Sequence, residues 1–169
     1  MGKFACFVLI LALVAASSAA NRGPSTADER ARLLKAADLM QKKPLSPEAR
    51  KEGTWALQWI TDVPDINVTI CGSFSPEYKF EPQMMAADVI SMGAFIVKNP
   101  KKATDQNAIW RAGVEGMLTT YASLLDKNRD AHDDFYDDLI QQRSDDNLVS
   151  FMHEFGLRCY AGAGSRSTT

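Results

Sequence analysis

The sequence predicts an all-α fold, a compact bundle of five to six helices within one domain over residues 26–160. Apolar residues recur at three- and four-residue spacing through most of the chain, which is the period of an amphipathic helix. Prolines and capping residues divide this pattern into successive segments. Only residues 65–72 alternate apolar and polar side chains as a strand does, and a lone strand has nothing to pair with. We therefore expect residues 65–72 to form an extended connector.

Residues 1–20 have the layout of a secretory signal peptide. Lys3 precedes an apolar run over Phe4–Val14, and small residues follow as far as Ala20. This run is too short to remain as a membrane-spanning helix, and no later apolar stretch is longer. We expect cleavage near Ala20, a periplasmic or secreted protein with no permanent membrane span, and a flexible leader over residues 21–25.

The first two helices are predicted by their ends. Thr26 and Glu29 have the spacing of a capping box, and Pro44 ends the helix that they begin. Ser46 is a good N-cap for a second helix over about Pro47–Thr61, with proline at the first helical position.

The third and fourth helices are expected over about Pro82–Lys98 and Gln106–Asp126. The third is apolar on nearly all sides, which is typical of the buried centre of a bundle, and Asn99-Pro100 ends it. Gly113 and Gly116 each cost about 1 kcal/mol inside the fourth helix. We expect these two glycines to let a neighbouring helix approach closely.

A fifth helix is expected over about Asp130–Arg143, and Asp145 is expected to cap a sixth. Gly156 has the features of a left-handed residue that ends the sixth helix. Residues 161–169 are small, polar and rich in glycine, which predicts a disordered tail.

Two cysteines remain after removal of the signal peptide, which contains Cys6. In an oxidising compartment, Cys71 and Cys159 are expected to form a disulfide that closes a loop of about 88 residues. Such a bond stabilises the fold by roughly 4–5 kcal/mol in the chain-entropy model. The alternative is two small buried residues that do not meet.

An acidic block near residues 126–138 is the one local concentration of reactive groups. Carboxylates four residues apart on a helix repel each other, which a bound divalent cation would relieve. The spacing does not match a calcium loop, and acids also favour the first turn of a helix because of its dipole. A cation site and a purely structural role therefore both remain open. The candidate metal ligands are Asp126, Asp130, Asp133, Asp134 and Asp137.

Composition and motifs point away from several classes of function. The chain has 19 basic and 21 acidic residues, a balance that gives no footprint for nucleic acid. His132 and His153 stand in no recognisable catalytic arrangement, so we expect neither an enzyme nor a cofactor. Asn67-Val68-Thr69 fits the N-glycosylation pattern.

The middle of the chain resembles the periplasmic immunity proteins that neutralise type VI secretion amidase toxins. In that family an aromatic turn, a cysteine, an apolar helix ending in Asn/His-Pro and an alanine-rich helix follow in order. The counterparts here are Trp59–Asp62, Cys71, Gln83–Val97, Asn99-Pro100 and Ala108–Leu125. The family usually has four cysteines, and this chain lacks the one expected near Leu125. The chain is also similar, more loosely, to small helical periplasmic acid-stress chaperones.

From the residues and the resemblance, we expect an exported, non-catalytic helical protein that binds another exported protein, as an inhibitor or immunity protein does. One alternative is a cation-binding or stress-protective envelope protein that uses the acidic block. The other is an enzyme of unrecognised type.

Overall fold

The computed structural model describes residues 22–70, 74 and 77–154, and this part of the chain is helical, with no strand. The predicted all-α class is therefore confirmed. Residues 1–20, Cys71, Cys159, Gly156 and residues 161–169 lie outside the described residues, as do the predictions made for them. The helices are α1 (Ala27–Lys42), α2 (Pro47–Asp62), α3 (Glu81–Lys98), η2 (Pro100–Lys102), α4 (Gln106–Lys127), η3 (Arg129–Ala131), α5 (Asp134–Ser144) and a last helical segment over 148–154.

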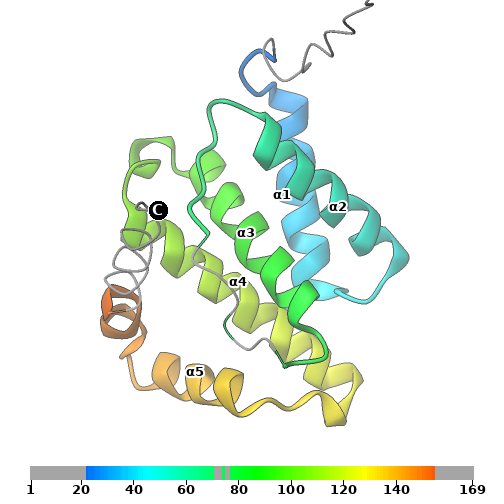
Figure 1. Ribbon diagram of the computed structural model, residues 1–169, viewed down its shortest axis with the longest axis vertical. Coiled ribbons are helices and arrows are strands. Elements are labelled where there is room, and N and C mark those ends of the chain that lie inside the picture. Colours follow the sequence, from blue (N-terminus) through cyan, green and yellow to red (C-terminus); the bar gives the residue numbers. More distant parts are fainter. Residues whose placement is uncertain (1–21, 71–73, 75–76, 155–169) are drawn as a thin grey trace, which may run out of the picture.

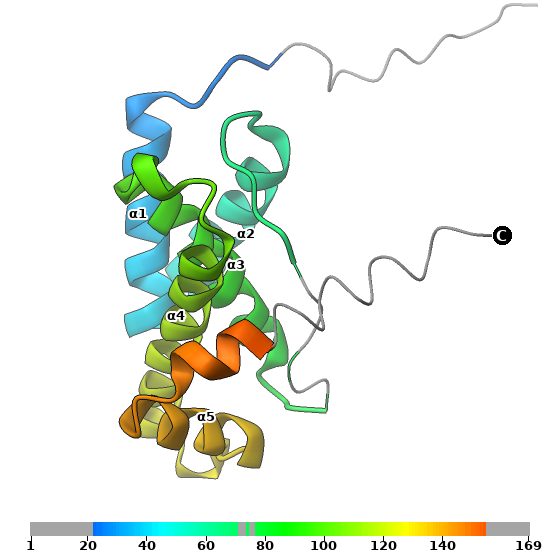
Figure 2. The ribbon, with the colours of Figure 1, turned by 90° about the vertical axis from the view of Figure 1, so that its left-hand side faces the viewer.

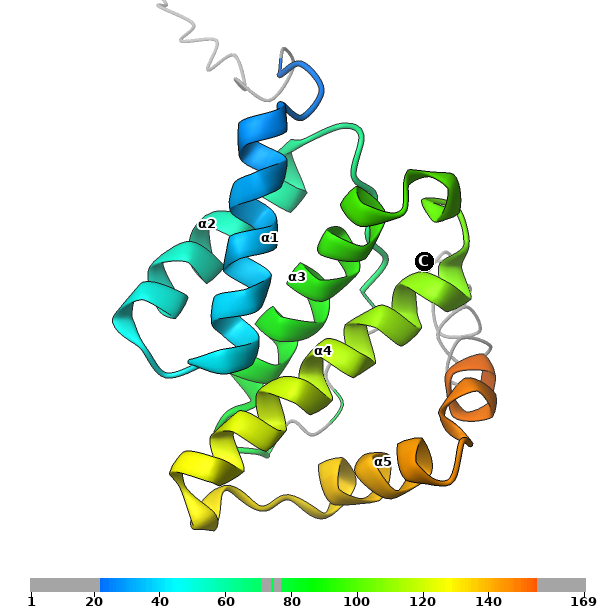
Figure 3. The ribbon, with the colours of Figure 1, turned by 180° about the vertical axis from the view of Figure 1, so that it is seen from behind.

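Helix α3 lies at the centre of the bundle, as its sequence predicts. It contacts α1, α2 and α4, and most of its side chains from Met84 to Ile96 are buried. The α1–α2 pair covers one side of α3. Helix α4 runs diagonally past α3 and packs against both α3 and α1 (Figure 1). Helix α5 follows a sharp turn after α4 and packs near the end of the bundle (Figure 3).

The predicted helix starts are confirmed by their capping hydrogen bonds. The Thr26 side chain accepts from the Glu29 N–H while the Glu29 carboxylate accepts from the Thr26 N–H, which completes a capping box. The Ser46 hydroxyl accepts from the Ala49 N–H at the start of α2. Each cap satisfies N–H groups that have no partner inside the helix, so local sequence alone sets where these helices begin.

The two glycines of α4 lie where α3 and α4 approach most closely, as predicted. A Cβ atom added to Gly116 would clash with the Ser91 side chain and meet a backbone carbonyl oxygen of α3 at 3.3 Å. A Cβ atom at Gly113 would clash with the Asp88 carboxylate and lie 2.8 Å from Met92 Cγ. The absence of side chains at these two positions therefore permits the α3–α4 packing.

The predicted start of the fifth helix is wrong. Asp130 belongs to the short η3 turn, and α5 begins only at Asp134. The reason is a cap: the Asp133 carboxylate accepts from the N–H groups of Phe135 and Tyr136, which fixes Asp133 just outside the helix.

The predicted cap of the sixth helix is also wrong. Asp145 is the C-cap of α5, with its N–H bonded to the carbonyl of Gln141. Asp146 follows with a φ of 57°, which turns the chain before the next helical segment begins at residue 148. Aspartate adopts this left-handed conformation more readily than most residues do.

The alternating segment is an extended connector, as predicted, at least over residues 66–70. It has no strand partner in the described chain, and Ile66 is buried where the connector leaves α2. The Trp110 indole N–H donates to the Thr69 carbonyl at 3.2 Å, which ties the connector to α4. The connector runs along the side of the bundle that lies away from α1 (Figure 2).

None of the helices in the described part of the chain has the length and apolar character needed to cross a membrane.

Replacing Gly116 with alanine should test the close approach of α3 and α4. We expect Gly116→Ala to lower the free energy of unfolding by about 1–3 kcal/mol, because the Ser91 Cβ atom cannot rotate away from the added methyl group. The matched control is Gly53→Ala in α2, where the tightest contact of the added Cβ is the flexible Met40 sulfur at 3.1 Å. The control should be neutral or stabilising by up to about 1 kcal/mol, since alanine favours a helix interior. Urea unfolding of both variants measures the difference, and equal effects would contradict the packing described.

Candidate binding groove

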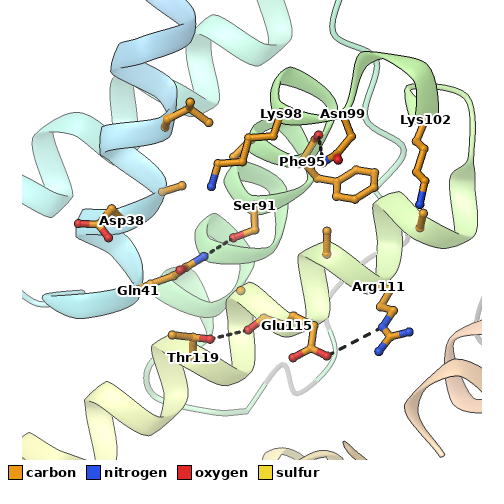
Figure 4. Close-up of a pocket in the computed structure, with 16 residues that line it drawn as sticks. Asp38, Gln41, Ser91, Phe95, Lys98, Asn99, Lys102, Arg111, Glu115 and Thr119 are labelled. Carbon is orange, nitrogen blue, oxygen red and sulfur yellow. Dashed lines mark hydrogen bonds and ion pairs between the residues drawn. The ribbon is translucent and has the colours of Figure 1, made fainter.

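A groove of about 560 Å³ lies between α1, α3 and α4. Small residues make up much of its lining, so no large side chain fills the space above the contact between the helices. Figure 4 shows the groove with α1 on one side and α4 on the other, and with α3 behind. The small residues that line it are Ala37, Ser91, Ala94, Ala108, Ala112 and Gly116.

Hydrogen bonds between the helices hold the walls of the groove in place. The Gln41 side-chain amide of α1 donates to the Ser91 hydroxyl of α3 at 3.1 Å (Figure 4). The Ser123 hydroxyl of α4 donates to the Gln41 carbonyl oxygen at 2.6 Å, and the Thr120 hydroxyl lies 3.4 Å from the Met40 carbonyl oxygen. Gln41 therefore connects α1 to both other helices at the end of the groove.

Each carboxylate that lines the groove lies close to a basic side chain. Asp38 pairs with Lys42 at 2.6 Å, so a cation outside the groove neutralises it. Glu115 lies 4.0 Å from Arg111 and 3.7 Å from Arg143 of α5. The carboxylates of the groove are thus already partnered.

The two lysines of the groove differ from its carboxylates. Lys98 and Lys102 are exposed, and within the described part of the chain neither forms an ion pair or a side-chain hydrogen bond. Lys98 is in the last turn of α3, and Lys102 ends η2 directly after it. Both ammonium groups are consequently free to meet an anion.

Apolar and neutral polar groups complete the lining. Leu34 and Phe95 are half-buried and present apolar surface, while Asn99 and Thr119 present an amide and a hydroxyl group. Asn99 donates to the Phe95 carbonyl, and Thr119 donates to the Glu115 carbonyl, which leaves their oxygen atoms able to accept. This mixture of apolar, donor and acceptor groups suits a peptide better than a purely apolar ligand.

The Ser91 hydroxyl is buried in the described lining of the groove, and its hydrogen bond comes from an amide. Ser91 accepts from the Gln41 amide, and among the described residues no histidine, lysine or carboxylate bonds to it. A serine nucleophile requires such a base within hydrogen-bond reach.

The acidic block lies at the other end of α4, and two of its carboxylates have structural partners. Asp133 caps α5, and Asp137 accepts from the Tyr121 hydroxyl at 2.7 Å. His132 Nδ1 lies 3.1 Å from the other oxygen of Asp137. These contacts dock α5 on α4, so the acids serve the packing of that corner.

The remaining metal candidates do not join these two in one cluster. Asp126 pairs with its neighbour Lys127 at 2.8 Å, and Asp134 is exposed in the first turn of α5. Asp130 lies in η3, where its N–H donates to Asn128. Across residues 22–70, 74 and 77–154, no three histidine, cysteine or acidic side chains come together as metal ligands would.

Sequence reasoning missed a buried tyrosine–carboxylate contact beside the acidic block. Glu81 is only 7 % exposed, and the Tyr136 hydroxyl donates to it at 2.6 Å. Burial, followed by the contact with Glu81, raises the pKa of Tyr136 well above its usual range. Tyr78 and Tyr121 pack against Tyr136, with ring centroids 5.3 Å from it in both cases. The two partners are 55 positions apart in sequence, so no local pattern signals their contact.

Asp88 is a second buried acid that the sequence did not single out. It is 5 % exposed, faces Gly113 and has no hydrogen-bond partner among the described residues. It borders a small cavity whose described lining, which includes Met92 and Trp110, contains no other titratable group. Burial, and to a lesser degree the charge of Glu81, raises the pKa of Asp88 from 3.8 to about 7.

Comparison of two aspartate variants separates the capping role of Asp133 from the effect of its negative charge. Asp133→Ala should lower the free energy of unfolding by about 1 kcal/mol more than Asp134→Ala, because only Asp133 accepts the N–H bonds that start α5. Both variants remove one carboxylate from the same helix end, so Asp134→Ala is the matched control. Urea unfolding measures both. Equal losses, or a rise in the melting temperature of the unmodified protein with calcium, would favour a cation site instead.

Asp88 should make stability fall as pH rises. The pKa of its carboxyl group is higher in the folded state than in the unfolded state, so the folded protein binds more protons between about pH 4 and about pH 7. Over that window the contribution of Asp88 lowers the free energy of unfolding by up to about 1.4 kcal/mol per pH unit. Asp88→Asn should remove this slope, whereas Asp28→Asn at an exposed site of α1 should not. Parallel pH profiles for Asp88→Asn and the unmodified protein would contradict the assignment.

No protein-family model, no curated protein and no solved structure matches this chain.

Proposed function

We propose that this protein is an exported, non-catalytic binding protein that holds a segment of another exported protein in the groove between α1, α3 and α4. The observation that carries this proposal is the groove itself. Small residues make up much of its lining, and its walls are fixed by hydrogen bonds between helices. Such a preformed surface favours binding because little of it has to be ordered when a partner arrives.

The lining chemistry supports a polypeptide partner. A peptide backbone needs both donors and acceptors, and Gln41, Asn99 and Thr119 offer amide and hydroxyl groups at the groove. Leu34 and Phe95 provide apolar contact for side chains. The Ser91 hydroxyl, bonded to an amide rather than to a base, supports binding rather than catalysis.

Export is the second part of the proposal, and the sequence of residues 1–20 supports it. Cleavage near Ala20 leaves only a few residues before α1, and the capping box at Thr26 would start that helix independently of the removed segment. A disulfide between Cys71 and Cys159 belongs to the same proposal, since an oxidising compartment would permit it. The resemblance to immunity proteins supports an inhibitory role for the complex.

The cation-binding alternative has less support. Asp133 and Asp137, the two most buried members of the proposed metal set, already accept hydrogen bonds from the protein. Binding a cation there would compete with the contacts that dock α5 on α4.

The partner can first be captured from the groove. The photoreactive residue p-benzoylphenylalanine replaces Thr119, which is exposed at the edge of the groove, and in a control chain it replaces Gln58, which is exposed on α2. Both chains are produced in the source cells with residues 1–20 intact and then irradiated. We expect a discrete cross-linked protein from position 119 and none from position 58.

Occupation of the groove is then tested with the identified protein. Ala112→Trp should block binding because the indole would fill the groove, while Ala122→Trp places the same side chain on an exposed position of α4 outside the groove. Titration calorimetry should show at least about a tenfold loss of affinity for Ala112→Trp alone, equivalent to about 1.4 kcal/mol. Circular dichroism confirms that both variants fold. The proposal fails if position 119 captures nothing, or if the two tryptophan variants bind equally well.

A further inference from the structure

We infer that the segment held in the groove is acidic, and that its carboxylates meet Lys98 and Lys102. This inference rests on the proposed function and specifies the chemistry of the partner.

The groove is locally basic in a chain that is acidic overall. The whole chain has a net charge of −2, yet the groove is lined by three cations and two carboxylates. The carboxylates are neutralised, Asp38 by Lys42 and Glu115 by Arg111 and Arg143. Among the described residues, the positive charge of Lys98 and Lys102 has no counterpart, which is the condition for complementarity with an anionic partner.

The two lysines lie at one end of the groove and flank it. Figure 4 shows the Lys98 side chain extending from α3 toward α1, while the Lys102 side chain extends from η2 toward α4. Phe95 and Asn99 lie between them in this view, and the Asn99 amide is fixed by its bond to the Phe95 carbonyl. A carboxylate at this end could approach either ammonium group while the rest of its chain follows the groove.

The stability of α3 does not require the side chains of Lys98 and Lys102 to lie at the groove. A cation in the last turn of a helix interacts favourably with the helix dipole, by about 0.3–1 kcal/mol at an exposed site. Lys98 obtains this benefit wherever its side chain points, so the dipole does not explain why it lies over the groove. Lys102 follows Lys101, which is equally exposed and does not line the groove. This neighbour supplies a control of identical charge.

An acidic protein segment fits the lining better than a nucleic acid does. Grooves that bind single-stranded nucleic acid combine positive charge with several aromatic rings on which bases stack. Phe95 is the only aromatic residue in the described lining.

The experiment compares two double variants of equal charge. Lys98→Glu with Lys102→Glu reverses both free cations of the groove, and Lys43→Glu with Lys101→Glu reverses two exposed lysines outside it. The probe is the protein captured from position 119. We expect at least about a tenfold loss of affinity for the groove variant and less than about a twofold loss for the control, since lost attraction adds to new repulsion only in the groove.

Two further readouts identify the ligand. Mass spectrometry of the cross-linked peptide should locate the contact in a segment rich in Asp and Glu. Raising the salt concentration should weaken binding by the unmodified protein more than binding by the groove variant, because salt screens the attraction between charges. Treatment with nuclease before irradiation should leave the cross-link intact.

The outcomes separate this inference from the function on which it rests. Equal affinities for the two double variants, a cross-linked segment without acidic residues, or loss of the cross-link with nuclease would each overturn the inference. Binding blocked by Ala112→Trp would still support the proposed function in the first two cases. Absence of any cross-link from position 119 would instead remove the proposed function itself.

Discussion

The close approach of α3 and α4 is the constraint on which the rest of this structure depends. Gly113 and Gly116 remove the side chains that would otherwise separate the two helices, and Asp88 and Ser91 occupy the space. This contact buries a carboxyl group without a hydrogen bond among the described residues, which is costly. It also places a small hydroxyl group, rather than a large side chain, on the floor of the groove. The contact between α3 and α4 thus shapes both the packing of the bundle and the floor of the candidate groove.

The groove depends equally on how its charges are distributed. Its carboxylates are held by cations from α1, α4 and α5, so they add polarity without adding free charge. Its two lysines, which form no ion pair within residues 22–70, 74 and 77–154, lie at the junction of α3 and η2, where the chain turns. The acidic block at the far end of α4 has the opposite character, because its central carboxylates accept hydrogen bonds that fix α5. Carboxylates near one end of α4 are therefore paired with cations around the groove, whereas those at the other end accept the hydrogen bonds that fix α5.

Local features of the chain could be predicted from the sequence, whereas features built from distant segments could not. Thr26 and Ser46 set helix starts through bonds to residues three positions away, and the α4 glycines were recognisable because they are costly inside a helix. The predicted start of α5 is too early because several aspartates are suitable caps, and the contact between the Asp133 N–H and the Tyr121 hydroxyl of α4 has no local sequence signal. The groove is lined by residues of α1, α3 and α4 that meet only in the folded chain, so its lysines could not be distinguished from ordinary surface lysines. Glu81 and Asp88 were hidden for the same reason, since their burial depends on α4 and α5.

A crystal structure of the complex with the captured protein is the most direct measurement of the central claim. The account predicts that a segment of the partner lies between α1, α3 and α4, with carboxylate oxygens within about 4 Å of the Lys98 and Lys102 ammonium groups. It also predicts that α3 and α4 keep their close contact at Gly116. A partner bound on α2, on α5 or on the extended connector, with the groove empty, would contradict the account.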